Sequence, residues 1–190
     1  MTIRYTPTHP HLNYFLALER DFETVARFIE PCEQNQSTFS LELARLLMAT
    51  TQEVDVVMKL LCNHLDSSNA ANNINDYCSI IMANRPEMIY DKVELPRYGM
   101  ETQPWINWTT DNPPFWWTAN NKIKHQRTHH FDRATLKNSF NALGALHLTL
   151  LHLSRMQITT AYHGDTWLEI MEQHNSVLFQ VAVDHLRRHA

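Results

Sequence analysis

The sequence predicts an all-α protein, an antiparallel bundle of five to six helices with one long irregular loop and, at most, a short β-hairpin. Apolar residues recur at intervals of three and four over several long stretches, the pattern of a helix that buries one face. Only 3 of the 190 residues are glycine, which disfavours a β fold with many tight turns. The length suits a single domain covering residues 1–190, and long helices with short links favour antiparallel packing.

Three helices are predicted in the first half of the chain. The first starts at Pro10, which suits a first turn because a missing N–H costs nothing there. The second, the longest, lies between Ser37 and Asp66 and follows an entry rich in residues that cap helices. The third covers 73–83 and ends before Pro86, because the residue preceding a proline disfavours helical geometry.

The stretch from Met88 to Trp108 has a different residue pattern from the helical segments. Pro96 and Pro104 interrupt it, and its β-branched and aromatic residues alternate only in patches. We therefore expect a long loop that includes a short hairpin at most. A connection of this length usually has a function or covers something.

A fourth helix is predicted from the segment PPFWWTANNKIKHQR, residues 113–127. Asp111 or Asn112 is the expected N-cap, with Pro113 or Pro114 in the first turn. The pattern breaks between Thr128 and Asp132.

A fifth helix is predicted from Arg133 to about Met156. Nearly every face is apolar between residues 142 and 153, so this helix should be central, and its His147 and His152 should be core residues with satisfied polar atoms. The tail, 166–189, predicts one more helix and an extended piece at SVLFQV, residues 176–181.

Composition narrows the range of functions. The formal charge of −4 provides no global field for nucleic acid or a membrane, so an RNA-binding role requires a local basic patch. Three cysteines without a C-x-x-C motif argue against a disulfide framework and favour a reducing cytosol. The start of the chain lacks the apolar segment of a signal peptide, and the apolar run at 143–153 is too short to span a bilayer. We expect a cytoplasmic protein that does not associate with a membrane.

The fourth helix carries the polar groups of chemical interest. At about 100° per residue, Asn121 and Lys124 lie on the face of Trp117, and His125 lies beside them. Lysine binds phosphate oxygens, histidine transfers protons near neutral pH, and an asparagine amide can orient a ring or a ribose hydroxyl. The alternative is structural: basic residues up to Arg127 complement the helix dipole, and the other polar groups are simply exposed.

The N-N-x-x-x-H pattern of Asn120, Asn121 and His125 resembles the signature of the HEPN superfamily, and TFSLELARLL and QEVDVVMKLL of the second helix are similar to bacterial HEPN-like proteins. The resemblance implies an all-helical homodimer that is associated with RNA or a nucleotide in a stress, defence or toxin–antitoxin system. If the chain is an enzyme, the resemblance implies a metal-independent endoribonuclease without a cofactor. His125 would transfer protons, Asn121 would orient the ring or the ribose, and Lys124 and Arg127 would hold the phosphate. The family's motif begins with arginine, for which this sequence has Asn120, so the match is degenerate.

Two further readings stay open. The chain could be a non-catalytic interaction module, an inactive partner or an antitoxin, with the Met88–Trp108 segment as its contact surface for a protein. It could instead hold a metal through His125, His129 and His130, because histidines four residues apart on a helix can share an ion.

The sequence also predicts partners for two acidic residues of the second helix. Glu53 is either exposed or a partner of Lys124, Arg127 or His125, and in the second case it belongs to the binding site. Asp55 and Lys59 are spaced to form a surface ion pair.

Overall fold

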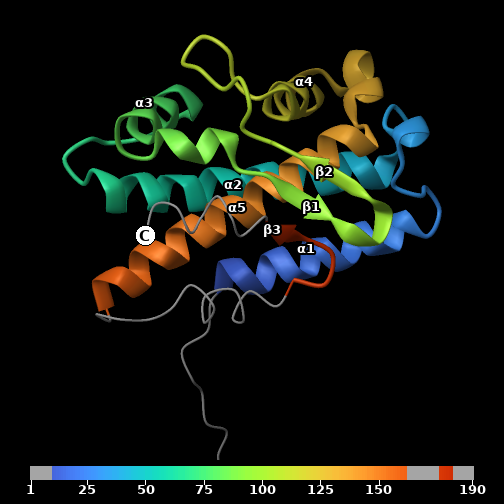
Figure 1. Cartoon of the computed structure of the whole chain (residues 1–190). Coiled ribbons are helices and arrows are strands. Elements are labelled where there is room, and N and C mark those ends of the chain that lie inside the picture. The colour runs from blue at the N-terminus through green and yellow to red at the C-terminus, as the bar shows by residue number, and fades with distance from the viewer. Residues whose placement is uncertain (1–9, 162–175, 182–190) are drawn as a thin grey trace, which may run out of the picture.

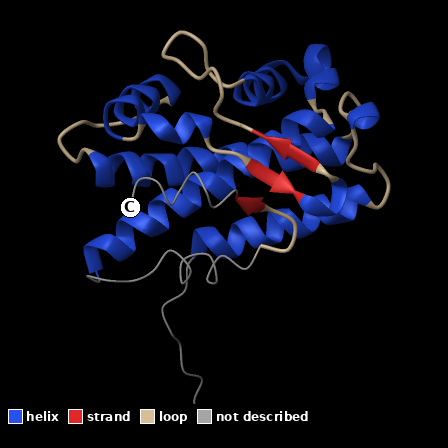
Figure 2. Cartoon of the chain, viewed as in Figure 1, coloured by secondary structure: helices blue, strands red, loops and turns tan. Residues whose placement is uncertain are grey.

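The computed structural model describes residues 10–161 and 176–181 (Figure 1). This part of the chain is mostly helical, with a small antiparallel sheet, as Figure 2 shows. The longest interface joins α2 (Leu41–Leu65) to α5 (Leu136–Ala161). Both helices also contact α1 (Pro10–Ala26) and α4 (Phe115–His130), while α3 (Ile74–Asn84) packs against α2. The predicted predominance of helices, with a short hairpin, is confirmed for the described residues.

The first three helices lie where the sequence predicts them, and capping residues fix their starts. The Ser40 side chain accepts a hydrogen bond of 3.1 Å from the Leu43 N–H at the start of α2. Asn73 accepts hydrogen bonds from the N–H groups of Asn75 and Asp76 at the start of α3. Each cap satisfies N–H groups that have no partner within the helix.

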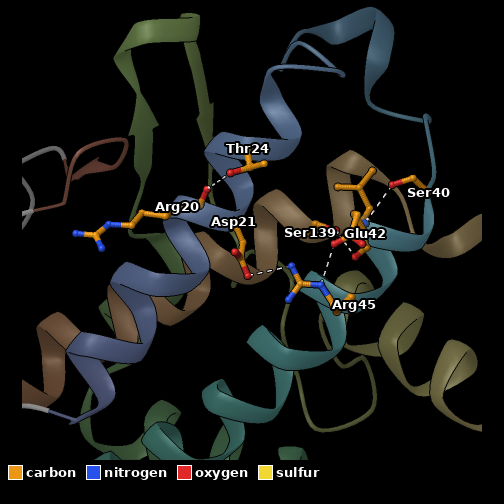
Figure 3. Close-up of polar contacts among 8 residues, drawn as sticks. Arg20, Asp21, Thr24, Ser40, Glu42, Arg45 and Ser139 are labelled. Carbon is orange, nitrogen blue, oxygen red and sulfur yellow. Dashed lines mark hydrogen bonds and ion pairs between the residues drawn. The ribbon is translucent and has the colours of Figure 1, made fainter.

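Polar contacts join the start of α2 to its neighbours, as Figure 3 shows. Arg45 donates to Glu42 at 2.8 Å and to Asp21 of α1 at 3.0 Å. The hydrogen bond to Glu42, and after it the one to Asp21, raises the pKa of Arg45. These side chains are exposed, so the pairs orient the helices more than they stabilise them. Ser139 of α5 donates to the buried Leu43 carbonyl at 3.0 Å.

The predicted central position of the fifth helix is confirmed, because every residue from 141 to 153 of α5 is buried. The helix begins at Leu136, three residues later than predicted, after the short 3-10 turn η4 (Phe131–Arg133). Thr135 sets this start, since its side chain accepts a hydrogen bond of 3.2 Å from the Asn138 N–H.

The irregular segment folds against α5. A 3-10 turn, η2 (Pro86–Tyr90), leads into a hairpin of β1 (Val93–Leu95) and β2 (Met100–Thr102), joined by η3 (Pro96–Tyr98) and Gly99. Gly99 has a φ of 61°, a left-handed conformation that glycine adopts without strain. The expected hairpin is therefore present.

A third strand, β3 (Gln180–Val181), completes the sheet in the order β2-β1-β3 and pairs Val181 with Val93. The predicted extended piece at residues 176–181 is thus confirmed in part, while the tail helix falls mostly in 166–175 and 182–189, which lie outside the described residues.

Two findings bear on the compositional expectations. None of the described helices combines the length and the apolar character needed to cross a membrane. Cys32, Cys62 and Cys78 are all free thiols.

Candidate functional site

Tryptophans anchor the start of α4. Trp116 packs edge-on against Trp105, with ring centroids 5.3 Å apart, and donates from Nε1 to the Pro104 carbonyl at 2.8 Å. Trp105 and Trp108 are also buried, with ring centroids 4.6 Å apart. The rings are therefore packing anchors, and they fix the polar side of α4 in place.

The predicted N-cap of this helix is wrong. The helix begins at Phe115 with Pro114 at the capping position, so both prolines precede the helix. The Asn112 amide donates instead to the Asn107 carbonyl at 3.0 Å, which closes a turn of the preceding loop.

A cavity of about 630 Å³ lies between α2, the start of α3 and α4. On the α4 side it is lined by Trp117, Asn120, Asn121 and Lys124. Asn120 is buried, while Asn121 and Lys124 are exposed at the opening. The structure thus brings together three of the predicted site residues.

Sequence reasoning missed the opposite wall of this cavity. It is lined by residues of α2 and by the segment that leads into α3: Met48, Ala49, Thr51, Gln52, Asp55, Asn72, Asn73 and Ile74. A signal was available, because positions 48, 52 and 55 share one helical face of α2. The two asparagines carried only a capping signal, and nothing local shows that they face another helix.

Hydrogen bonds hold this wall in place. The Tyr77 hydroxyl donates to Asp55 at 3.0 Å, and burial together with the Asp55 charge raises the pKa of Tyr77. Lys59 donates to Asn72 at 3.3 Å. The expected Asp55–Lys59 ion pair is therefore wrong, since each side chain bonds to a residue of the third helix or its entry.

A kink in α4 separates the remaining predicted residues from the cavity. Gln126 has the non-helical angles φ −143° and ψ 47°, two residues before the predicted break. His125, just before it, is exposed and does not line the cavity. Arg127, just after it, places its guanidinium carbon 5.5 Å from the centre of the Phe131 ring. Within one copy of the chain, neither His125 nor Arg127 lies at the cavity together with Asn121 and Lys124.

The metal alternative gains no support from the geometry. Within residues 10–161 and 176–181, no group of three or more histidine, cysteine, aspartate or glutamate side chains could hold a metal ion. The kink at Gln126 explains this for His125, His129 and His130, because it breaks the helical spacing that would align them.

Glu53 has a partner that the sequence did not indicate. Its Oε1 accepts a hydrogen bond of 2.6 Å from His11 Nδ1 at the start of α1. The predicted pairing of Glu53 with Lys124, Arg127 or His125 is therefore wrong, and Glu53 ties α1 to α2 outside the cavity.

Helix α4 carries an excess of positive charge. Its sixteen residues include Lys122, Lys124, Arg127 and three histidines but no acidic side chain. In a chain of net charge −4, this helix supplies the local basic patch that an anionic ligand requires.

Comparisons with models of protein families, with curated proteins and with solved structures found no match.

Proposed function

We propose that the chain is a cytoplasmic, HEPN-like helical bundle that binds RNA or a nucleotide in the cavity between α2, α3 and α4. The observation that supports this proposal is the meeting of Asn120, Asn121 and Lys124, from a helix without acidic side chains, at one cavity. Its volume of about 630 Å³ lies within the range of small-molecule sites, roughly 300–1,000 Å³.

The lining provides the groups that a nucleotide needs. Amides both donate and accept hydrogen bonds, so Asn121 suits the edge of a base. Asp55, oriented by Tyr77, accepts from an exocyclic amine or a ribose hydroxyl. Lys124 at the opening supplies a charge for one phosphate.

Binding does not require cleavage in this proposal. The position of the family's motif arginine holds Asn120, and His125 lies outside the cavity of a single chain. A cleaving form would need a homodimer that brings His125 to RNA bound at the cavity, with His125 as the proton-transfer group. Cleavage and dimerisation are therefore tested separately from binding.

The binding test uses a fluorescent single-stranded RNA 12-mer and a set of mononucleotides, titrated at fixed ionic strength. Lys124→Gln and Asn121→Ala alter exposed side chains, so both variants should fold. We expect each to weaken binding by about fivefold, equivalent to roughly 1 kcal/mol. Lys92→Gln is the matched control, because Lys92 lies beside the hairpin and pairs with Glu101 at 2.8 Å. Equal affinity in all four proteins, or no binding by the parent, would refute the proposal.

The cleavage test compares the parent, His125→Ala and His129→Ala on the same RNA, with light scattering for the oligomeric state. His129 is an exposed histidine of the same helix and controls for the loss of an imidazole. Loss of cleavage in His125→Ala alone assigns the proton transfer to His125. Binding without cleavage by a monomeric parent identifies a purely RNA- or nucleotide-binding protein.

A further inference from the structure

A second cavity, of about 520 Å³, lies against a different side of α4. It is formed by the loop that precedes the helix, by the first two turns of α4, by Arg133 of η4 and by Asn138 of α5. Lys122 and Arg133 line it, and none of its described lining residues is acidic. Lys122 and Lys124 are two positions apart, about 200° around a helix, which explains why each faces a different cavity.

The charges around this second cavity favour an anion. Arg133 pairs with Asp132, with 3.9 Å between its Nε and the Asp132 Oδ2. Both of these side chains are more than half exposed, so water and salt weaken their pairing. Lys137 adds a third positive charge, its Nζ lying 5.2 Å from the centre of the ring of Phe115, a lining residue.

A buried amide holds the backbone of Arg133. Asn138 is 8% exposed, lines the cavity, and donates from Nδ2 to the Arg133 carbonyl at 2.7 Å. This hydrogen bond holds the backbone that carries the guanidinium. The Arg133 side chain therefore extends from a fixed backbone rather than from a free loop.

The start of α4 adds to the positive potential. Pro114, the capping residue, makes no side-chain hydrogen bond to the helix, and it lines the cavity together with Phe115. The first N–H groups of a helix have no acceptor within the helix. In α4 the side chain of the capping residue does not supply an acceptor either. An anion near this end of α4 gains from the helix dipole.

The remaining lining is apolar. Ile106, Pro113 and Phe115 offer a surface for an apolar or aromatic body. The volume exceeds that of an inorganic phosphate several times over, so a free ion would leave most of the cavity to water.

We infer that this cavity binds a phosphate monoester with an apolar or aromatic body. The phosphate group lies between Lys122 and Arg133, and the body packs against the ring of Phe115. The site is separate from the proposed nucleotide cavity and does not depend on it.

The experiment uses calorimetric titration with phenyl phosphate, inorganic phosphate and phenol, on the parent and on Lys122→Gln, Arg133→Gln and Lys92→Gln. We expect phenyl phosphate to bind the parent more tightly than inorganic phosphate, and phenol not to bind. Lys122→Gln and Arg133→Gln should each weaken phenyl phosphate binding by about tenfold, the effect of one lost charge-assisted hydrogen bond. Lys92→Gln, which lines neither cavity, should bind as the parent does.

An NMR titration with phenyl phosphate locates the site independently of the variants. The amide signals of Phe115, Thr118 and Arg133 should shift, because these residues line the cavity. Shifts confined to other residues, equal affinity for inorganic phosphate and phenyl phosphate, or no loss of affinity in either Lys122→Gln or Arg133→Gln would overturn the inference. An RNA 12-mer that displaces phenyl phosphate would overturn the monoester assignment in favour of a polynucleotide phosphate.

Discussion

His152 and Asp91 form a hydrogen bond of 2.6 Å between Nε2 and Oδ2 in the interior, where their side chains are only 6% and 5% exposed. The two residues are 61 positions apart and join α5 to the end of the η2 turn. This contact fixes the start of the irregular segment, next to η2, on the central helix α5. It also confirms the prediction that His152 is a core histidine with a satisfied ring nitrogen.

Breaking this pair should cost more than any exposed pair. His152→Ala or Asp91→Ala leaves the other polar group buried without its partner, which we expect to lower the free energy of unfolding by about 3–5 kcal/mol. Guanidinium unfolding followed by circular dichroism measures the loss. Lys92→Ala is the matched control, because its pair with Glu101 is exposed and should contribute at most about 1 kcal/mol. A loss in His152→Ala no larger than that of the control would show that the contact is not stabilising.

The helices could be predicted because their signals are local. Ser40 and Asn73 follow the general preference for capping residues, and the apolar run of the fifth helix contains enough positions to indicate full burial. Asp91 could not be identified as the partner of His152, because nothing local relates two residues separated by a hairpin and the fourth helix.

The candidate site could likewise be predicted only in part. The helical spacing of Asn121 and Lys124 correctly places them on one side of α4, whereas His125 and Arg127 do not reach the cavity. The kink at Gln126 could not be predicted from a proline or a glycine, because α4 contains neither. A physical reason lies in the burial pattern: Ile123 is the last buried residue of α4, so packing no longer holds the helix straight beyond it.

Glu19 should hold the segment of residues 176–181 on α1. This carboxylate is 2% exposed and accepts hydrogen bonds from the N–H groups of Val177 and Leu178 at 3.2 and 2.9 Å, and from the Ser176 hydroxyl. Glu19→Ala leaves these donors without an acceptor, so we expect a loss of about 2–4 kcal/mol in the free energy of unfolding. Hydrogen exchange at the Leu178 amide should accelerate in the same variant.

Glu23 provides the matched control for that substitution. It lies one turn further along α1 and pairs with Arg97 at 3.1 Å, with both side chains well exposed. Glu23→Ala should leave stability and the Leu178 exchange rate nearly unchanged. Equal effects of the two substitutions would mean that Glu19 has no special role in holding the segment.

The three thiols should differ in reactivity. Cys32 is partly exposed, whereas Cys62 and Cys78 are buried. Burial raises the pKa of Cys62 from 9.0 to about 12 and also raises the pKa of Cys78, which keeps both thiols protonated and unreactive. With Ellman's reagent at pH 8, we expect one fast thiol in the folded chain and three in guanidinium.

The shifted pKa of Cys62 also sets a direction for stability at high pH. The unfolded thiol ionises near pH 9, while the folded thiol stays protonated until about pH 12, so the unfolded state loses its proton first. The Cys62 contribution is therefore fully present below pH 9 and falls as the pH rises from 9 to 12. Cys62→Ala should reduce this decline relative to the parent, and an identical pH dependence in both proteins would contradict the assignment.

Gly144 marks the close approach of the hairpin to α5. A Cβ atom at this position would lie 3.5 Å from the Thr102 Cγ2 and 3.7 Å from the Val93 Cβ, which are ordinary van der Waals distances. Alanine therefore fits, and in a helix interior it is favoured over glycine by about 0.5–1 kcal/mol. We expect Gly144→Ala to stabilise the fold by up to about that amount, measured by thermal and guanidinium unfolding.

A larger side chain at position 144 should have the opposite effect. Gly144→Leu needs space that Val93 and Thr102 already occupy, so it must displace β1 or β2 from the helix at a cost of about 1–3 kcal/mol or more. Because Thr102 also donates from its hydroxyl to the Asn141 side chain, such a displacement would break a polar contact beside the hairpin. A stabilising alanine with a destabilising leucine would show that the sheet rests directly on the helix at this point, whereas two neutral substitutions would place the sheet further away.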